Sequence, residues 1–210
     1  MLAAWLDNDG DGCVDNPTVL TKLTEKVDLG GTVKVQAAIV VSETASYDKL
    51  NAAGYFTKAP QYNNETFPNC SGPAATSRCA DATLEEVLHM ITDVGFAKAF
   101  PTTFATSNTS NSLLTQALDV ARGGKFNTIP SPYPSNATYT YNDTSCKYPC
   151  QATEYIYFGV CTYVGAMVGR CVNKDVTNHP YGVKLEFKLC TKELLKNDTK
   201  LTAIIEVFIS

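Results

Sequence analysis

Hydrophobic and polar positions follow several distinct patterns along this chain, and together they predict a helix-rich fold. Apolar residues at helical spacing, bounded by caps, glycines or prolines, predict helices over residues 18–27, 81–100, 112–122 and 152–168. β-Branched or alternating residues predict strands over 33–41 and 183–189. A short helix is expected over 47–53. Elements over 192–196 and 201–209 close the chain, the latter as helix or strand. This order of elements indicates the α+β class.

Two long polar segments separate the predicted elements, over residues 57–80 and 125–150. The first is rich in proline and contains Cys70 and Cys79, for which a local disulfide is the expected arrangement. The second ends in Cys146-Lys-Tyr-Pro-Cys150, and a loop of this length in a compact domain is usually functional or cross-linked.

The domain organisation predicted from these segments is a single disulfide-stapled domain over residues 1–210, because the chain has no internal repeat and no clear linker. Within it, residues 1–28 would form an acidic loop with flanking helices, and residues 81–170 a helical core.

The eight cysteines indicate the compartment. They are Cys13, Cys70, Cys79, Cys146, Cys150, Cys161, Cys171 and Cys190. An even number at irregular spacing is typical of a disulfide framework, whereas a zinc site usually has paired C-x2-C motifs, which are missing here. We therefore expect all eight to be paired, although eight cysteines allow 105 connectivities.

Potential N-glycosylation sites support the same compartment. Six Asn residues begin an N-x-[ST] motif without proline: Asn64, Asn69, Asn108, Asn136, Asn142 and Asn197. The alternative is a cytosolic protein rich in Asn and Thr with free thiols. Because so many motifs accompany an even number of cysteines, we predict a secreted, extracellular glycoprotein.

Charge excludes some classes of partner. The formal net charge is -4 and no run of basic residues occurs, so nucleic acid and anionic membrane surfaces are not expected partners. The longest uncharged stretch, residues 155–169, is shorter than the ~18–20 residues of a membrane span. It is interpreted as a buried helix. Residues 1–6 are too short for the apolar part of a signal peptide, so we expect a trimmed piece of a longer precursor.

An acidic loop near the amino terminus carries the strongest motif, Asp7-Asn-Asp9-Gly-Asp11-Gly12-Cys13-Val-Asp15. Carboxylates at alternate positions of a tightly turned loop converge on one point, and Ca²⁺ takes six to eight oxygen ligands. The predicted ligands are the carboxylates of Asp7, Asp9, Asp11 and Asp15 and the backbone carbonyl of Cys13. The alternative is a solvated acidic turn, in which the four carboxylates would repel one another.

This loop resembles EF-hand loops and, still more, the D-x-D-x-D-G-x-x-D loops of thrombospondin type 3 repeats. The resemblance covers about nine residues and implies a structural calcium ion. Thr18 stands where an EF-hand has its bidentate glutamate, so the last ligand differs.

A second motif, Glu85-Glu86-Val-Leu-His89, lies in the predicted helix over residues 81–100. In zinc peptidases, H-E-x-x-H places two histidine ligands one turn apart with a glutamate between them as general base. Here Glu85 and His89 occupy the ligand positions and Glu86 the position of the base. The alternative is a capping box between Thr83 and Glu86, with the acids favoured by the helix dipole.

The segment Thr153-Glu154-Tyr-Ile-Tyr-Phe158 is similar to the downstream glutamate helix of gluzincins, particularly the anthrax lethal-factor-like group. The resemblance implies a degenerate zincin-like domain in which Glu154 is the third zinc ligand after Glu85 and His89. The first histidine of the family pattern is replaced by Glu85. The alternative for Glu154 is a first-turn acid or a buried partner of a basic residue.

Three functions remain open from these residues. The first is a non-catalytic, calcium-binding structural or interaction module of a matrix or filament, with other extracellular proteins or its own copies as partners. The second is a secreted zinc metallopeptidase with Glu86 as base. The third is a lectin-like or ligand-binding module that uses the tyrosine-rich loop 133–148.

Overall fold

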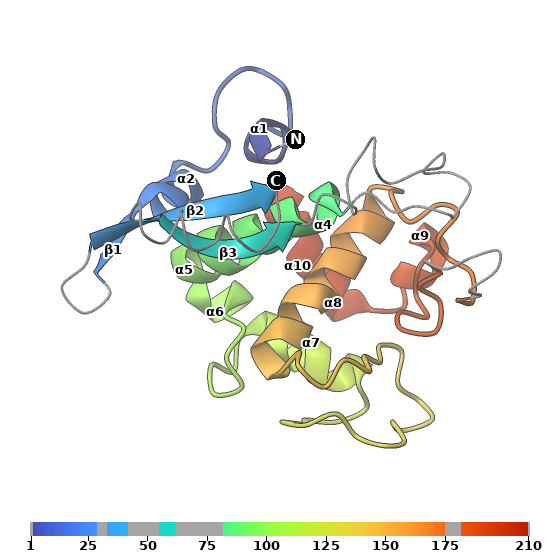
Figure 1. Cartoon of the computed structure of the whole chain (residues 1–210). Helices are drawn as coiled ribbons and strands as arrows, with labels where there is room; N and C mark the ends of the chain where they lie inside the picture. Colours follow the sequence, from blue (N-terminus) through green and yellow to red (C-terminus); the bar gives the residue numbers. More distant parts are fainter. Residues whose placement is uncertain (1, 29–32, 42–54, 62–81, 175–181, 210) are drawn as a thin grey trace. The chain divides into compact units, whose positions relative to one another are not determined.

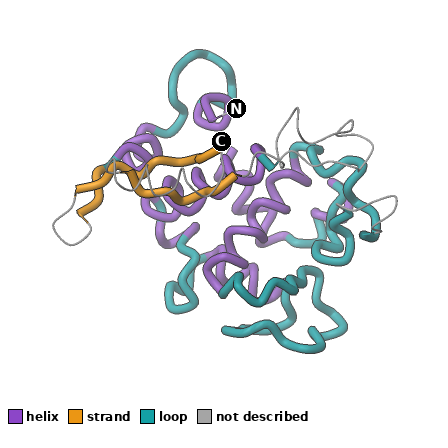
Figure 2. The backbone as a smooth tube through the Cα atoms, in the orientation of Figure 1, coloured by secondary structure: helices purple, strands orange, loops and turns teal. Residues whose placement is uncertain are grey.

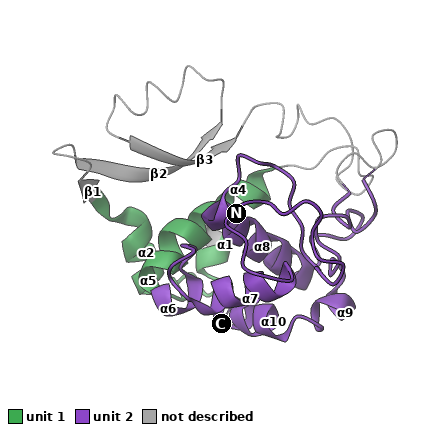
Figure 3. Cartoon of the chain, turned by 90° about the horizontal axis from the view of Figure 1, so that it is seen from below, with its two compact units in different colours: residues 1–71, 80–99 green, residues 72–79, 100–210 purple. Residues whose placement is uncertain are grey.

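The computed structural model describes residues 2–28, 33–41, 55–61, 82–174 and 182–209. The chain divides into two compact units, coloured separately in Figure 3. The first unit comprises residues 1–71 and 80–99, and the second residues 72–79 and 100–210. Helix predominates in the described residues, as predicted, and they contain one sheet of three strands.

The first unit combines the sheet with short helices. Its elements are α1 (Leu2–Leu6), α2 (Pro17–Thr24), β1 (Lys26–Asp28), β2 (Val33–Val41), β3 (Tyr55–Gln61), α4 (Thr83–His89), the π-helix η3 (Met90–Phe96) and α5 (Ala97–Ala99). Figure 1 shows the strand order β1-β2-β3, in which β2 pairs antiparallel with β1 and parallel with β3. The predicted strand over residues 33–41 is confirmed. Residues 57–61, predicted as loop, belong to β3, where their backbone pairs with β2.

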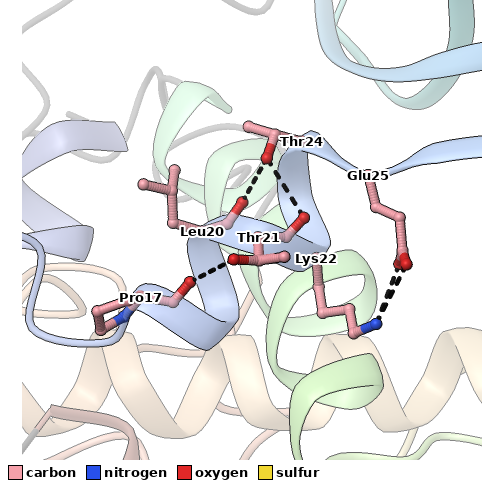
Figure 4. A network of polar contacts seen from close by, with 6 residues as sticks. All are labelled: Pro17, Leu20, Thr21, Lys22, Thr24 and Glu25. Carbon is pink, nitrogen blue, oxygen red and sulfur yellow. Dashed lines mark hydrogen bonds and ion pairs between the residues drawn. The ribbon is translucent and has the colours of Figure 1, made fainter.

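Helix α2 begins as its sequence predicts. The side chain of Asn16 accepts a hydrogen bond from the Val19 amide at 3.2 Å, and Pro17 occupies the first helical position. Figure 4 shows the helix's end, where the Thr24 hydroxyl donates to the Leu20 carbonyl. The helix stops at Thr24 rather than at residue 27, because residues 26–28 pair with β2 as strand β1.

The segment from α4 through η3 to α5 forms the predicted helix over residues 81–100, with a π-helical stretch in its middle. π-Helix is rare and occurs mostly as short stretches inside α-helices. This stretch packs closely against α2. A Cβ atom on Gly95 would lie 2.8 Å from Val19 Cγ1 and 3.3 Å from Leu23 Cγ. Only glycine lets η3 approach α2 this closely.

The second unit is built from helices and loops, as Figure 2 shows. Its helices are α6 (Pro101–Phe104), α7 (Leu113–Ala121), α8 (Tyr148–Tyr163), α9 (Lys192–Leu195) and α10 (Thr199–Ile209). Ser112 caps α7 by accepting a hydrogen bond from the Thr115 amide at 3.1 Å. The apolar face predicted for this helix is buried except at Leu113, which is 50% exposed.

Helix α8 lies at the centre of this unit's core and packs against both α7 and α10. Gly159 allows the approach of α10, because a Cβ there would lie 2.8 Å from Leu201 Cδ2. An aromatic cluster covers another side of α8. The rings of Tyr155 and Phe158 lie 5.3 Å and 6.2 Å from that of Tyr139, and Phe187 stacks on Phe158 at 5.6 Å.

The predicted strand over residues 183–189 is wrong. This segment forms consecutive turns, and its one pairing is an isolated bridge between Phe187 and Tyr139. The alternation of apolar and polar residues arises because Val183, Phe187 and Leu189 face the core from a turned backbone. Residues 192–195 form α9, and residues 201–209, left open between helix and strand, lie in α10.

Two disulfides join described cysteines, Cys146–Cys150 and Cys171–Cys190. The first lies at the end of the segment 125–150, where a cross-link was expected, and closes only residues 146–150. The expectation that all eight cysteines are paired is wrong for Cys13, which is exposed in the acidic loop and forms no disulfide. Cys161 is completely buried in α8.

Several predictions fall outside the described residues: the helix over 47–53, the loop beyond residue 61, and the pairing of Cys70 with Cys79. The uncharged stretch over residues 155–169 is helical to Tyr163 and then turns. Among the described residues, no helix has both the length and the apolar character that crossing a membrane requires.

Candidate functional site

The acidic loop between α1 and α2 brings three of its four carboxylates together. One carboxylate oxygen each of Asp7, Asp9 and Asp15 lies within 4.8 Å of the others. The two glycines in the loop have positive φ, +74° at Gly10 and +86° at Gly12, which supplies the sharp turn that brings alternate side chains to one point.

Hydrogen bonds close this loop on itself. The Asp7 carboxylate accepts from the Gly12 amide at 3.0 Å, and the Asp15 carboxylate accepts from the Asn8 amide at 2.6 Å. The Asp15 amide in turn donates to the Leu6 carbonyl at 2.8 Å. The two ends of the loop are therefore joined through its acidic side chains.

One carboxylate oxygen in this cluster has an unusual environment. Asp7 Oδ1 is buried, and no donor in the described part of the chain hydrogen-bonds to it. Buried polar atoms in proteins nearly always have a hydrogen-bond partner or a bound ion. Asp7 Oδ1 is thus an acceptor that a cation at this point would satisfy.

One predicted calcium ligand, Asp11, differs from the three carboxylates that converge. The Asp11 carboxylate is not part of the close cluster, and its Oδ1 accepts from the Cys13 amide at 2.7 Å. Of the predicted carboxylates, the structure therefore brings together those of Asp7, Asp9 and Asp15, whereas the Asp11 carboxylate stabilises the turn of the loop.

Helix α4 positions the second candidate site. Glu85 and His89 lie one turn apart, and a carboxylate oxygen of Glu85 and a ring nitrogen of His89 lie within 4.8 Å of each other. Glu86, the candidate base, has its Oε2 3.7 Å from His89 Nδ1. All three side chains are partly buried. The spacing predicted from the sequence thus places a carboxylate and an imidazole where they could share a metal ion.

The capping box considered for this helix is wrong. The residue before α4 is Ala82, and no side chain caps the helix through a hydrogen bond. Glu86 instead faces along the helix toward His89, which lies one turn further on. The acids of the first turn still suit the helix dipole.

Glu154 lies on α8 of the second unit, seven residues into the helix, and is 8% exposed. Its neighbours show the influence of its charge. Burial raises the pKa of Tyr139 well above its ordinary value, and the Glu154 carboxylate raises it further. Burial also raises the pKa of Glu186; Lys174 and Arg170 lower it, while Glu154 raises it. Glu154 is therefore not the first-turn acid considered from the sequence.

The tyrosine-rich loop 133–148 contributes to a pocket that sequence patterns did not reveal. Tyr133, Tyr141 and Asn142 line it together with Lys174 and Glu186. Lys174 and Glu186 were missed because they stand in no motif, and only folding brings residues so distant in the chain to the loop.

The predicted glycosylation sites within the described residues are accessible to different degrees. Asn136, Asn142 and Asn197 are exposed, whereas Asn108 is half-buried and donates to the Asn127 side chain at 3.1 Å. Asn64 and Asn69 lie outside the described residues.

Comparison of the chain with protein-family models, with curated proteins and with solved structures found no match. The function is therefore argued from the two candidate metal sites and the pocket themselves.

Proposed function

We propose that this chain is a secreted calcium-binding N-glycoprotein with a structural or interaction role. The observation that carries the proposal is the convergence of Asp7, Asp9 and Asp15, with Asp7 Oδ1 buried and no donor from the described residues on it. Carboxylate oxygens are the ligands that Ca²⁺ prefers, and a divalent ion would offset their mutual repulsion.

Calcium at this point would have a structural effect. The loop joins α1 to α2, and its ends already meet through the bond from the Asp15 amide to the Leu6 carbonyl. An ion bound by residues 7, 9 and 15 would stabilise this contact between the two ends of the loop. Extracellular modules bind calcium with Kd of about 10⁻⁴–10⁻³ M, so millimolar calcium outside the cell would occupy such a site.

The two disulfides and the exposed N-x-[ST] motifs support an extracellular location. In that setting we expect N-linked glycans on the chain. Its partners would be other extracellular proteins or further copies of itself, as in a matrix or filament.

Terbium luminescence offers a direct test of the calcium site. Trp5, the single tryptophan, stands two residues before Asp7 and would sensitise Tb³⁺ bound in the loop. Calcium should displace Tb³⁺ and quench the signal. Asp9→Asn removes one charge but keeps an oxygen that can accept from the Asp11 amide, the bond that Asp9 Oδ1 makes at 3.2 Å. We expect this variant to bind calcium about tenfold more weakly, because ligand charge tunes affinity.

Glu193→Gln is the matched control, because Glu193 is an exposed acid on α9, remote in sequence from the loop. It should leave the affinity unchanged. Equal calcium affinity in the Asp9→Asn variant and the wild type, or no terbium signal at millimolar concentration, would refute the calcium site.

A second candidate function, a zinc metallopeptidase, is favoured by the pairing of Glu85 with His89 on α4. Glu154 would be the third ligand and Glu86 the general base, as the resemblance to gluzincins implies. Because Glu85 replaces the first histidine of the family pattern, we expect weaker zinc binding and no efficient peptidase activity.

Zinc content measured after dialysis tests this second candidate. One zinc per chain in the wild type, lost in His89→Ala and retained in Asp9→Asn, would favour the metallopeptidase. Zinc-free protein with an intact far-ultraviolet circular dichroism spectrum would exclude it and leave the structural role.

A further inference from the structure

A pocket of about 260 Å³ lies beside the tyrosine-rich loop of the second unit. Its lining includes two aromatic rings, from Tyr133 and Tyr141, and two charged side chains, from Lys174 and Glu186. Pockets for drug-sized molecules span about 300–1,000 Å³, so this one suits a single small ring.

The aromatic wall of this pocket is held rigidly. The Tyr133 hydroxyl donates to the Tyr141 carbonyl at 3.0 Å and accepts from the Tyr141 amide at 3.2 Å. The guanidinium of the buried Arg122 lies 5.9 Å from the centroid of the Tyr133 ring. The Tyr133 ring therefore need not reorganise to receive a ligand, which lowers the entropic cost of binding.

The floor of the pocket is also fixed. The Thr140 amide donates to the Glu186 carbonyl at 2.7 Å, and the Thr140 hydroxyl donates to the Leu185 carbonyl at 2.8 Å. At Gly182 a Cβ atom would lie 2.5 Å from the Val172 carbonyl oxygen, so only glycine permits this approach of two backbone segments. Three segments distant in sequence thus form one concave surface.

The chemistry of the lining matches a sugar ring. Aromatic faces pack against the C–H face of a pyranose, a carboxylate accepts hydrogen bonds from hydroxyl or amide groups, and an ammonium donates to a carbonyl. The Glu186 carboxyl is half-buried and poorly hydrated, and burial raises its pKa. Hydrogen-bond donors from a ligand would therefore offset the cost of burying this carboxyl group.

Asn142 connects this pocket to the glycosylation motifs. It lines the pocket, is exposed, and begins the motif Asn142-Asp143-Thr144. Its side chain makes no hydrogen bond to any residue in the described ranges, unlike that of Asn108. The next residue is ordered, since Asp143 Oδ1 accepts from the Ser145 amide at 2.8 Å.

We propose that this pocket seats the innermost N-acetylglucosamine of an N-glycan attached to Asn142. The proposal rests on the N-glycosylation proposed above. A sugar tethered at the rim has a high effective concentration at the pocket, so weak contacts suffice to hold it. Tyr133 and Tyr141 would pack on the ring, and Lys174 and Glu186 would bond its acetamido and hydroxyl groups.

The experiment uses the chain secreted from a eukaryotic host, with occupancy of each motif measured by glycopeptide mass spectrometry. Trimming to a single N-acetylglucosamine should leave the melting temperature unchanged. Asn142→Gln should lower it by about 2–4 °C, the change expected for loss of one modest interaction in a chain of this size. Asn136→Gln is the control, because Asn136 is an exposed motif residue outside the pocket lining.

A double variant separates contact from general effects of the glycan. In a Tyr141→Leu background, which keeps the backbone bonds to Tyr133, Asn142→Gln should cause no further loss. Suppose that Asn142 carries a glycan, but Asn142→Gln lowers the melting temperature no more than Asn136→Gln does, or lowers it equally in both backgrounds. Either result would overturn the pocket proposal without affecting the proposed glycoprotein. The pocket proposal would also fail if Asn142 carried no glycan while other motifs did. If no motif were occupied, the proposed glycoprotein itself would fail.

Discussion

The carboxylate of Asp198 links α8 to α10, and its removal offers a quantitative test of how the second unit holds together. One oxygen accepts from the Leu201 amide at 3.0 Å, which caps the start of α10. The other oxygen accepts a short hydrogen bond from the hydroxyl of Tyr155, a completely buried residue of α8. Asp198→Ala therefore removes a cap and leaves a buried hydroxyl without its acceptor.

The magnitude follows from these two losses. An N-cap contributes about 1 kcal/mol, and an orphaned buried donor costs about 1–3 kcal/mol. We expect Asp198→Ala to lower the free energy of unfolding by about 2–4 kcal/mol. Tyr155→Phe removes the hydroxyl and leaves no orphan in the core, so it should cost about 1 kcal/mol.

Urea denaturation of the two single variants and the double variant measures the coupling between these residues. In the Tyr155→Phe background, Asp198→Ala should cost only the cap, about 1 kcal/mol, which gives a coupling of roughly 1–3 kcal/mol. The motif that begins at Asn197 survives both changes, so glycosylation does not confound the result. Additive effects would show that the short bond does not link the helices.

Three further predictions concern packing, disulfides and pH. Gly159→Ala should destabilise by up to about 2 kcal/mol in urea denaturation, because the overlap with Leu201 costs about 1–3 kcal/mol and the gain in helix propensity offsets only ~1 kcal/mol of it. A variant more stable than the wild type would contradict the packing. Replacing Cys171 and Cys190 by serine should cost about 3 kcal/mol, since that disulfide spans 19 residues; a melting temperature unchanged on replacement would refute this. Burial, together with the hydrogen bond to Asp119, raises the pKa of Tyr148 in the folded state. The protonated hydroxyl therefore stabilises the fold fully below the unfolded-state pKa of about 10, and this stabilisation is lost as the pH rises through the folded-state pKa. Tyr148→Phe should therefore show a shallower loss of stability above about pH 10 than the wild type.

Local sequence signals predicted the elements and the acidic loop well. Asn16-Pro17 and Ser112 begin the helices that they were expected to begin, because a cap acts within three residues of its own position. The alternate aspartates and the glycines between them turn the loop for the same local reason. The strand predicted over residues 183–189 failed, because alternating burial also arises when a turned backbone packs on a core built elsewhere.

The sequence by itself determined where helices begin, which residues of the first loop carry negative charge, and which asparagines can accept a glycan. These properties depend on residues a few positions apart. The structure was needed to show that Asp7, Asp9 and Asp15 converge while the Asp11 carboxylate accepts from the Cys13 amide. Only the tertiary structure decided that Cys171 pairs with Cys190. The pocket lined by Tyr141 and Glu186 also depends on the tertiary structure, because these residues are far apart in the sequence and only packing brings them together.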